Sequence, residues 1–144
     1  MHGQLNGCIG TINGAEPLGH SVARLALSAA FADPRLPSLQ PADYAHLDIT
    51  ISLLSPLSPI AAGSRADLKA ALRPGHDGLV IHAGERQPLV LPTVWEQLPD
   101  PDDFLDHLWW KAGMRPRTGP AGMCAFRFST QHHERRTGGV ARVA

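Results

Sequence analysis

The stretch Leu79-Val80-Ile81-His82-Ala83, followed by Gly84-Glu85 and then by Leu89-Val90-Leu91, is the part of the sequence that decides the fold. Two apolar runs flank a pair of residues suited to a hairpin turn. They predict two antiparallel strands that lie side by side, because parallel neighbours would need a much longer crossover connection.

A second strand pattern lies upstream of this hairpin. Residues 47–53 alternate between apolar and polar side chains, which is typical of a strand with one buried face. The apolar positions of that face are Leu47, Ile49, Ile51 and Leu53. Shorter patterns predict strands over residues 9–12 and 123–130, and residues 132–144 are expected to fray.

Helices are expected between these strands. Apolar residues at helical spacing run from Pro17 to the Asp33-Pro34 stop, and a shorter run covers residues 66–72. A third helix is expected from Pro101, capped by Asp100, to Gly113. Its inward stripe would consist of Phe104, Leu108 and Ala112.

The short connections and the hairpin favour an α+β fold with a mixed, largely antiparallel sheet and about three helices packed on it. A chain of 144 residues fits one domain. We expect that domain to cover residues 1–130 and a flexible tail to cover residues 131–144.

The charge balance argues against nucleic acid and membrane surfaces as partners. Lys plus Arg and Asp plus Glu are 13 each, so the formal net charge is +0. No apolar run is long enough to span a bilayer, and residues 1–4 lack the features of a signal peptide. The two cysteines do not form a disulfide framework, which favours a reduced, cytoplasmic setting. The eight histidines show no metal-site spacing.

Cys8 is the main candidate for chemistry, because it lies between Gly7 and Gly10. Glycine lets a ligand or another backbone approach closely, so the thiol could act as a nucleophile or contact a ligand. A thiol reacts as its thiolate, which needs a nearby base or cation. The alternative is a small residue chosen for tight packing, since free cysteines are often buried.

Six segments closely resemble the AMMECR domain family, whose bacterial members are called AmmeMemoRadiSam system protein A. The resemblance implies a curved sheet built from two related strand-and-helix units, and the family has no established reaction. The usual helix and strand before the cysteine motif are missing, so we expect an N-terminally truncated member. The segments that carry the resemblance are residues 5–11, 28–35, 49–54, 75–79, 91–97 and 111–113.

The resemblance also nominates residues for the site. His76 matches the family's His-Gly region and is the histidine we expect nearest to Cys8. Asn6 stands where the family usually has Arg, so this member lacks that cation and its activity could be altered. The further ligand-binding candidates are Gly7, Gly10, Asp33, Arg35 and Ser52. A local ion pair is the simpler explanation for Asp33 and Arg35.

Two functions fit these residues. One is an enzyme in which Cys8, assisted by His76, acts on a small molecule in a pathway with Memo-like and radical SAM proteins, as the family's name suggests. The other is a scaffold module that binds a peptide or partner protein. No particular cofactor is indicated. Residues 5–12 would form an exposed strand edge, so self-association is also expected.

Overall fold

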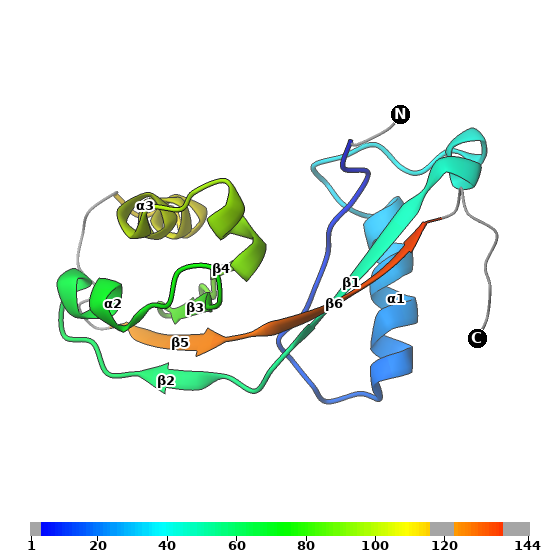
Figure 1. Ribbon diagram of the computed structural model, residues 1–144. Helices are drawn as coiled ribbons and strands as arrows, with labels where there is room; N and C mark the ends of the chain where they lie inside the picture. The colour runs from blue at the N-terminus through cyan, green and yellow to red at the C-terminus, as the bar shows by residue number, and fades with distance from the viewer. Residues whose placement is uncertain (1–3, 116–122, 137–144) are drawn as a thin grey trace. The chain divides into compact units, whose positions relative to one another are not determined.

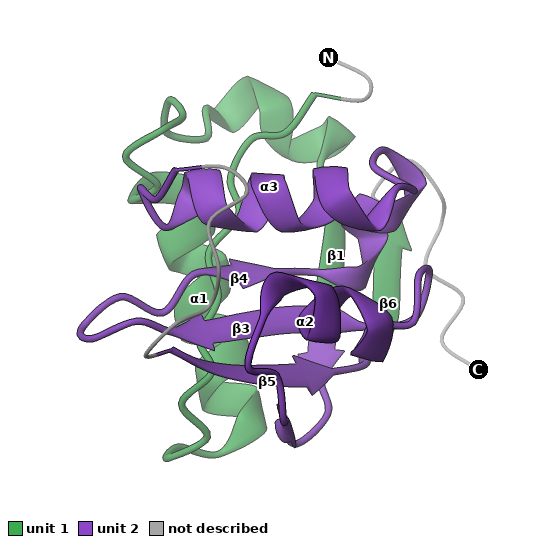
Figure 2. Cartoon of the chain, turned by 90° about the vertical axis from the view of Figure 1, so that its left-hand side faces the viewer, with its two compact units in different colours: residues 1–52, 132–144 green, residues 53–131 purple. Residues whose placement is uncertain are grey.

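The computed structural model describes residues 4–115 and 123–136. It divides into two compact units: unit 1 contains residues 1–52 and 132–144, and unit 2 contains residues 53–131 (Figure 2). Helices and antiparallel strands occur together, which confirms the predicted α+β class.

Unit 2 contains a four-stranded sheet with the strand order β2-β5-β3-β4. The strands are β2 (Ser58–Ile60), β3 (Gly78–His82), β4 (Leu89–Val90) and β5 (Cys124–Phe128). Strands β3 and β4 are antiparallel, with Leu79 opposite Val90, which confirms the predicted hairpin. The turn uses Gly84, whose φ of 63° lies in the left-handed region that favours glycine.

The sequence did not predict β2, because Pro59 lies in its middle. Proline cannot donate a backbone hydrogen bond and is confined to edge strands, bulges or strand starts. Strand β2 is the edge of this sheet and pairs on one side with β5, where Pro59 is opposite Phe126. An edge position therefore accommodates Pro59 within a strand.

Two helices and a short 3-10 helix complete unit 2: α2 (Arg65–Ala71), η2 (Pro92–Glu96) and α3 (Pro101–Lys111). The Asp100 side chain accepts a hydrogen bond from Asp102 N at 2.7 Å, which confirms the predicted cap. The expected inward stripe of α3 is also confirmed, since Phe104, Leu108 and Ala112 are all buried.

Helices α2 and α3 cover one face of the sheet (Figure 1) and form the hydrophobic core with it. Leu79 and Ile81 of β3 meet Leu68 of α2 and Leu108 of α3 in this core. Trp95 of η2 stacks on Phe104 with ring centroids 3.8 Å apart, so Trp95 has the core role that its surroundings dictate. Every residue of this core cluster belongs to unit 2.

Unit 1 consists of α1 (Leu18–Phe31), the 3-10 helix η1 (Pro41–His46) and most of a two-stranded sheet of β1 (Asp48–Leu54) and β6 (Thr130–Arg136). The last two residues of β1 and the first two of β6 belong to unit 2. The expected helix and the expected strand over residues 47–53 are therefore present. The expected strand over residues 9–12 is wrong, because no strand or helix forms over residues 4–16. The final strand runs on to Arg136, so residues 132–136 do not fray as expected.

The predicted burial of β1 is wrong as well. Ile49 is 39% exposed, and Leu47, Ile51 and Leu53 are only half-buried. The alternating pattern places the apolar side chains on one face, but burial along the strand does not alternate, because nothing in the pattern shows what covers that face. Strand β1 pairs with β6 in a separate sheet and is not part of the core cluster of unit 2.

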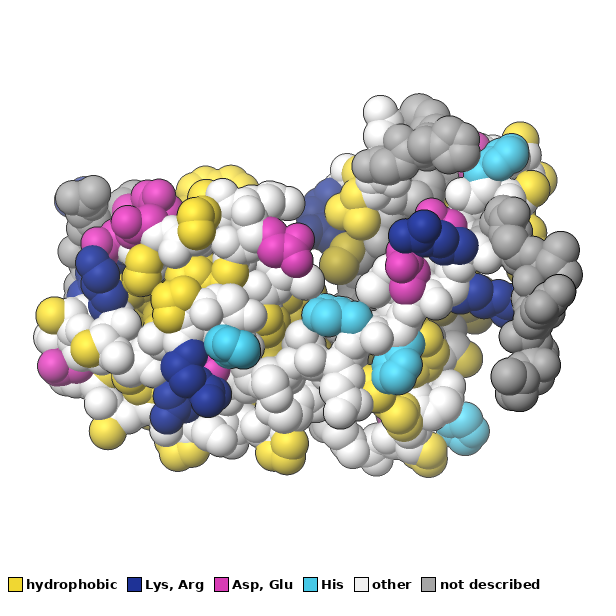
Figure 3. All heavy atoms as spheres, viewed as in Figure 1, with side chains coloured by type: hydrophobic (Ala, Val, Ile, Leu, Met, Phe, Trp, Pro, Cys, Tyr) yellow, Lys and Arg dark blue, Asp and Glu magenta, His cyan; other side chains and the backbone are white. Residues whose placement is uncertain are grey.

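Unit 1 has very little buried apolar surface of its own. Among its described residues only Ser21 and Asp33 are buried, and both are polar. Hydrophobic side chains reach the surface in both units on the face drawn in Figure 3. The large exposed ones in unit 1 are Leu5, Ile12, Leu18, Leu27, Phe31, Tyr44 and Ile49.

Candidate functional site

The segment that carries Cys8 lies against helix α1. A Cβ atom placed on Gly7 would lie 1.7 Å from the carbonyl oxygen of Ala29, so only glycine fits there without moving the backbone. The close approach that the glycines predicted is therefore made at Gly7 by the chain's own helix. A Cβ on Gly10 would meet nothing within 4 Å.

Asp33 and Arg35, just beyond the end of α1, hold the Cys8 backbone from both sides. Asp33 Oδ2 accepts a hydrogen bond from Cys8 N at 3.0 Å, and Arg35 Nη2 donates to the Cys8 carbonyl oxygen at 2.6 Å. The two side chains also bind each other, with Arg35 Nε 2.9 Å from Asp33 Oδ1 and Arg35 Nη2 2.7 Å from Asp33 Oδ2. The expected local ion pair thus exists, and it also fixes the cysteine segment. We call this arrangement the Cys8 clamp.

Charge pairing stabilises the ionised form of both members of the Cys8 clamp. The Arg35 guanidinium, followed by the Cys8 and Arg35 backbone N–H groups, holds the pKa of Asp33 well below its usual range. The Asp33 carboxylate raises the pKa of Arg35 in return. The Asp33 side chain is only 2% exposed, whereas that of Arg35 is 63% exposed and can meet a ligand.

The thiol of Cys8 is exposed while its peptide groups are fixed. Cys8 therefore does not fill a core position, which was the alternative to a chemical role. Asn6, two residues before it, is half-buried. Within residues 4–115 and 123–136, no group hydrogen-bonds to the Asn6 side-chain amide.

His76 lies in a separate, equally well-fixed loop in unit 2. His76 N and Asp77 N both donate to the Arg73 carbonyl at 3.1 Å, and Gly75 has a φ of 82°. The fully buried Asp77 accepts from Arg73 N at 2.9 Å and from Arg73 Nη2 at 2.8 Å, while its own carbonyl accepts from Trp95 Nε1 at 2.7 Å. The His76 side chain is exposed.

Cys8 belongs to unit 1 and His76 to unit 2. The structure describes each unit by itself, so the predicted pairing of these two residues stays a prediction. The residues that the structure does bring together are Cys8, Asp33 and Arg35, with Gly7 setting the backbone path and Asn6 beside them in the chain.

Ser52 lies elsewhere in unit 1, on the sheet formed by β1 and β6. Its hydroxyl oxygen is 2.8 Å from His132 Nδ1. The sequence analysis did not identify His132 as a partner, because nothing in the sequence showed that residues 132–136 would pair with β1. Ser52 and His132 satisfy each other's hydrogen-bonding groups, as polar neighbours on the surface of a sheet usually do.

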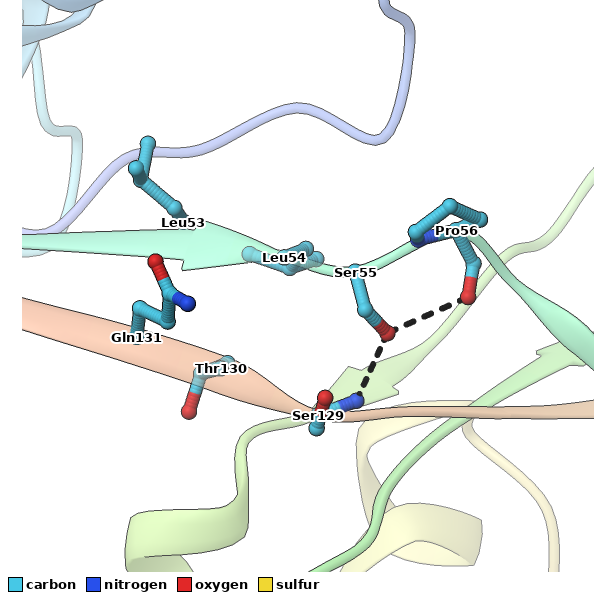
Figure 4. Close-up of a pocket in the computed structure, with 7 residues that line it drawn as sticks. All are labelled: Leu53, Leu54, Ser55, Pro56, Ser129, Thr130 and Gln131. Carbon is cyan, nitrogen blue, oxygen red and sulfur yellow. Dashed lines mark hydrogen bonds between the residues drawn. The ribbon is translucent and has the colours of Figure 1, made fainter.

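A shallow cavity of about 300 Å³ lies where β1 ends and β6 begins, and it was not predicted. Its lining consists of Leu53, Leu54, Ser55, Pro56, Ser129, Thr130 and Gln131 (Figure 4). Ser55 Oγ donates to the Pro56 carbonyl at 3.1 Å and accepts from Ser129 N at 2.9 Å, so its hydroxyl serves the local structure. The lining contains no thiol, carboxylate or imidazole.

The described residues contain no group of three or more His, Cys, Asp or Glu side chains that could hold a metal ion. Over the same residues, no helix combines the length and apolar character that crossing a membrane requires.

These observations define a class of α+β protein in which an Asp-Pro-Arg segment holds an exposed cysteine. The AMMECR1 family profile matches residues 1–133, and the chain belongs to this family. A protein of Methanothermobacter thermautotrophicus is 36% identical over 115 residues, which are 79% of this chain and 60% of that protein. Protein MJ0810 of Methanocaldococcus jannaschii is 32% identical over 133 residues, or 91% of this chain and 66% of that protein.

A solved structure shows the same fold. The crystal structure of the uncharacterized protein PH0010 from Pyrococcus horikoshii superposes with a TM-score of 0.81 at 27% sequence identity. The match covers 90% of this chain and 64% of that one. The match with such relatives covers between 50% and 66% of their length.

Proposed function

We propose that the Cys8 clamp is the reactive site of an enzyme that acts on a small molecule through the Cys8 thiol. The observation that carries this proposal is the combination of an exposed thiol with peptide groups held by Asp33 and Arg35. A nucleophile fixed in this way needs no reorganisation of its own backbone when a substrate arrives, which is how positioning lowers a barrier.

Arg35 suggests that the substrate carries a negative charge. Its Nε and Nη2 atoms are engaged by Asp33 and Cys8, and no described residue accepts a hydrogen bond from its Nη1. This N–H pair lies on a mostly exposed guanidinium. A carboxylate or phosphate bound there would sit beside the thiol. Arg35 would thereby supply a cation in a chain that has the neutral Asn6 where the family usually has Arg.

In the proposed chemistry, the Cys8 thiol gives its proton to a base and the thiolate adds to a carbonyl carbon of the substrate, while the electron pair of the C=O π bond moves onto the oxygen. His76 is the proposed base, because an imidazole can accept a proton near neutral pH. Memo-like and radical SAM proteins are the proposed pathway partners. The proposed setting is the cytoplasm, where thiols stay reduced.

Alkylation rates test the thiol directly, and the chain provides its own control. Cys124 is also exposed, and among residues 4–115 and 123–136 no Asp–Arg pair binds its backbone. Cys124→Ser leaves Cys8 alone, and Cys8→Ser leaves Cys124 alone. With neutral iodoacetamide at pH 7, we expect Cys8 to react about tenfold faster than Cys124. Equal rates at the two cysteines would contradict the proposal.

Anionic iodoacetate then tests the role of Arg35. A guanidinium beside the thiol should raise the rate with iodoacetate more than the rate with iodoacetamide. Arg35→Gln should lower this ratio severalfold, and the control Arg24→Gln, which breaks an exposed ion pair between Arg24 of α1 and Glu16, should not. His76→Ala should slow Cys8 alkylation near neutral pH if His76 is the base, and an unchanged rate removes it from the site.

The scaffold function is the second candidate. The exposed apolar side chains of unit 1, among them Leu27 at 63% and Phe31 at 56%, favour it, because such side chains are typical of surfaces that bind another protein. Slow alkylation of Cys8 together with tight binding of a Memo-like protein would support the scaffold in place of the enzyme.

A further inference from the structure

The two-stranded sheet of unit 1 has an unused edge. Strand β1 pairs with β6, and in the described part of the chain it has no second strand beside it (Figure 1). Over the same part, the backbone of residues 48–54 makes no hydrogen bond to any element except β6. A row of unpaired N–H and C=O groups on a strand is a template for another strand.

The two strands of this sheet differ in how they guard against pairing. Strand β6 ends in Glu134, Arg135 and Arg136, and charged side chains are a common protection of strand edges. Strand β1 has one charged residue, Asp48, at its first position. Its remaining six residues are neutral, so nothing in β1 repels an approaching strand.

The sequence of β1 also matches itself when it is reversed. If two copies meet antiparallel with Ile51 opposite Ile51, Ile49 lies opposite Leu53 and Thr50 lies opposite Ser52. Over residues 49–53, apolar side chains then share one face and hydroxyls share the other, because pairing at even offsets keeps each residue on its own face. The outermost pair, Asp48 opposite Leu54, does not match. A register shifted by one residue would place Ile51 opposite Thr50 or Ser52 and lose this match.

We propose that the partner of this edge is a second copy of the same chain, paired antiparallel through β1 about Ile51. The two ribbons then form one four-stranded sheet in the order β6-β1-β1-β6, with a twofold axis at Ile51. The formal net charge of +0 means that no long-range repulsion opposes the association of two copies.

The small number of buried residues in unit 1 also favours a second copy of the chain as the partner. Its described residues bury only Ser21 and Asp33, and an isolated two-stranded sheet is marginally stable in water. Pairing through β1 doubles the number of strands and places Ile49 beside Leu53 of the second copy. The edge expected at residues 5–12 does not exist as a strand, so β1 takes over the role of the self-associating edge.

Disulfide trapping tests the register as well as the contact. In a chain that carries Cys8→Ser and Cys124→Ser, the variant Ile51→Cys places two thiols opposite each other at the twofold axis. Opposite Cα atoms in antiparallel strands are about 4.5–5.5 Å apart, within the range that a disulfide spans. We expect oxidised glutathione to convert most of the protein to a cross-linked dimer, with both thiols oxidised and glutathione reduced.

Ile49→Cys in the same background is the matched control. In the proposed register its two copies lie four residues apart along the strand, or about 14 Å, and cannot join. The double variant Ile49→Cys/Leu53→Cys should cross-link again. A chain that sediments as a monomer at all concentrations, or one in which Ile49→Cys cross-links as well as Ile51→Cys, would overturn the proposal.

A charge at the edge gives an independent measurement. Thr50→Lys brings like charges together across the proposed axis, so the dimer dissociation constant in analytical ultracentrifugation should rise about tenfold or more. His133→Lys, an exposed position on β6, should leave that constant unchanged. Equal effects of the two lysines would place the contact elsewhere than on β1.

Discussion

Unit 2 and unit 1 each contain a buried aspartate bound to an exposed arginine, and their surroundings give these pairs different roles. Asp77 lies in the unit that holds the hydrophobic core, and it closes the local loop from Arg73, with Arg127 Nη1 3.9 Å away. Asp33 lies in a unit with almost no buried apolar residues and reaches back 25 residues to the Cys8 backbone.

This difference shows that the same kind of ion pair can stabilise a loop in one unit and position a candidate reactive residue in the other. In unit 2 the sheet and helices already fix the chain on both sides, so the Arg73–Asp77 pair neutralises a buried charge and closes a five-residue loop. In unit 1 the segment before α1 has no regular structure, so its position depends on the Asp33–Arg35 pair and on the Gly7 contact with α1. Polar contacts of this kind hold an exposed reactive group in place without burying it.

The largest expected effect contrasts the apolar residues of the two units. Leu108 of α3 is fully buried, so Leu108→Ala should lower the free energy of unfolding by about 2–5 kcal/mol. Ile51 of β1 is half-buried, so Ile51→Ala should cost about 1 kcal/mol or less, because part of its surface is already in water. Urea titration at a concentration where the chain is monomeric gives both values.

A cost for Ile51→Ala as large as that for Leu108→Ala would show that β1 belongs to a core of its own, and the contrast between the units would fail. A small cost for Leu108→Ala would mean that the α3 site collapses around the deletion.

Much of unit 2 could be predicted from sequence because its signals are local. Asp100, Pro101 and Gly113 mark the ends of α3, and the residues around Gly84 mark a hairpin, all within a few positions of the structure that they determine. The failures in unit 1 concern contacts between distant segments. The pairing of residues 130–136 with β1 and the lack of cover over Ile49 leave no trace in the local pattern.

The candidate site could be predicted only in part for the same reason. Cys8, Asp33 and Arg35 were all identified, but the sequence suggested only that Asp33 and Arg35 pair with each other. Asp33 and Arg35 also hydrogen-bond to the Cys8 backbone. This contact depends on how the segment before α1 folds back over the helix end. The glycines gave a clear signal of close approach, but not whether the approaching group was a ligand or the chain itself.

The second prediction sharpens the contrast by testing how the Cys8 segment is held. Gly7→Ala would force a methyl group into the Ala29 carbonyl, so the backbone must move, at a cost of about 1–3 kcal/mol. Gly10→Ala is the matched control, because it meets nothing within 4 Å, and its effect should stay within about 0.5 kcal/mol. Urea titration gives the free energies, and iodoacetamide reports the state of the thiol.

We expect the alkylation rate of Cys8 to change in Gly7→Ala and to stay constant in Gly10→Ala. If both glycines tolerate alanine equally, the segment is not held against α1, and the Asp33–Arg35 pair alone would have to position Cys8.

The smallest expected effect is a local response of the Cys8 clamp to acid. The pKa of Asp33 is held well below its usual range by Arg35 and by two backbone N–H groups. A group with a lowered folded pKa gives its full stabilisation above its unfolded pKa, about 3.9 for Asp, and loses it as the pH falls from there through the folded value. The stability that the clamp adds to the fold should therefore be complete at pH 5 and decline below about pH 4, whereas the clamp itself should stay ionised in the folded protein until the pH approaches the lowered pKa of Asp33.

Amide NMR signals measure this response residue by residue. The Cys8 N–H and the Arg35 Nε–H, which both donate to Asp33, should shift together with one midpoint below about 3.9, while the Gly10 amide stays unchanged. Asp33→Asn should abolish the shared titration, because the amide has no charge to lose over this range. A midpoint at or above the ordinary aspartate value would mean that Arg35 does not hold Asp33 ionised, and the Cys8 segment would then have to be fixed by the Gly7 contact with α1 instead.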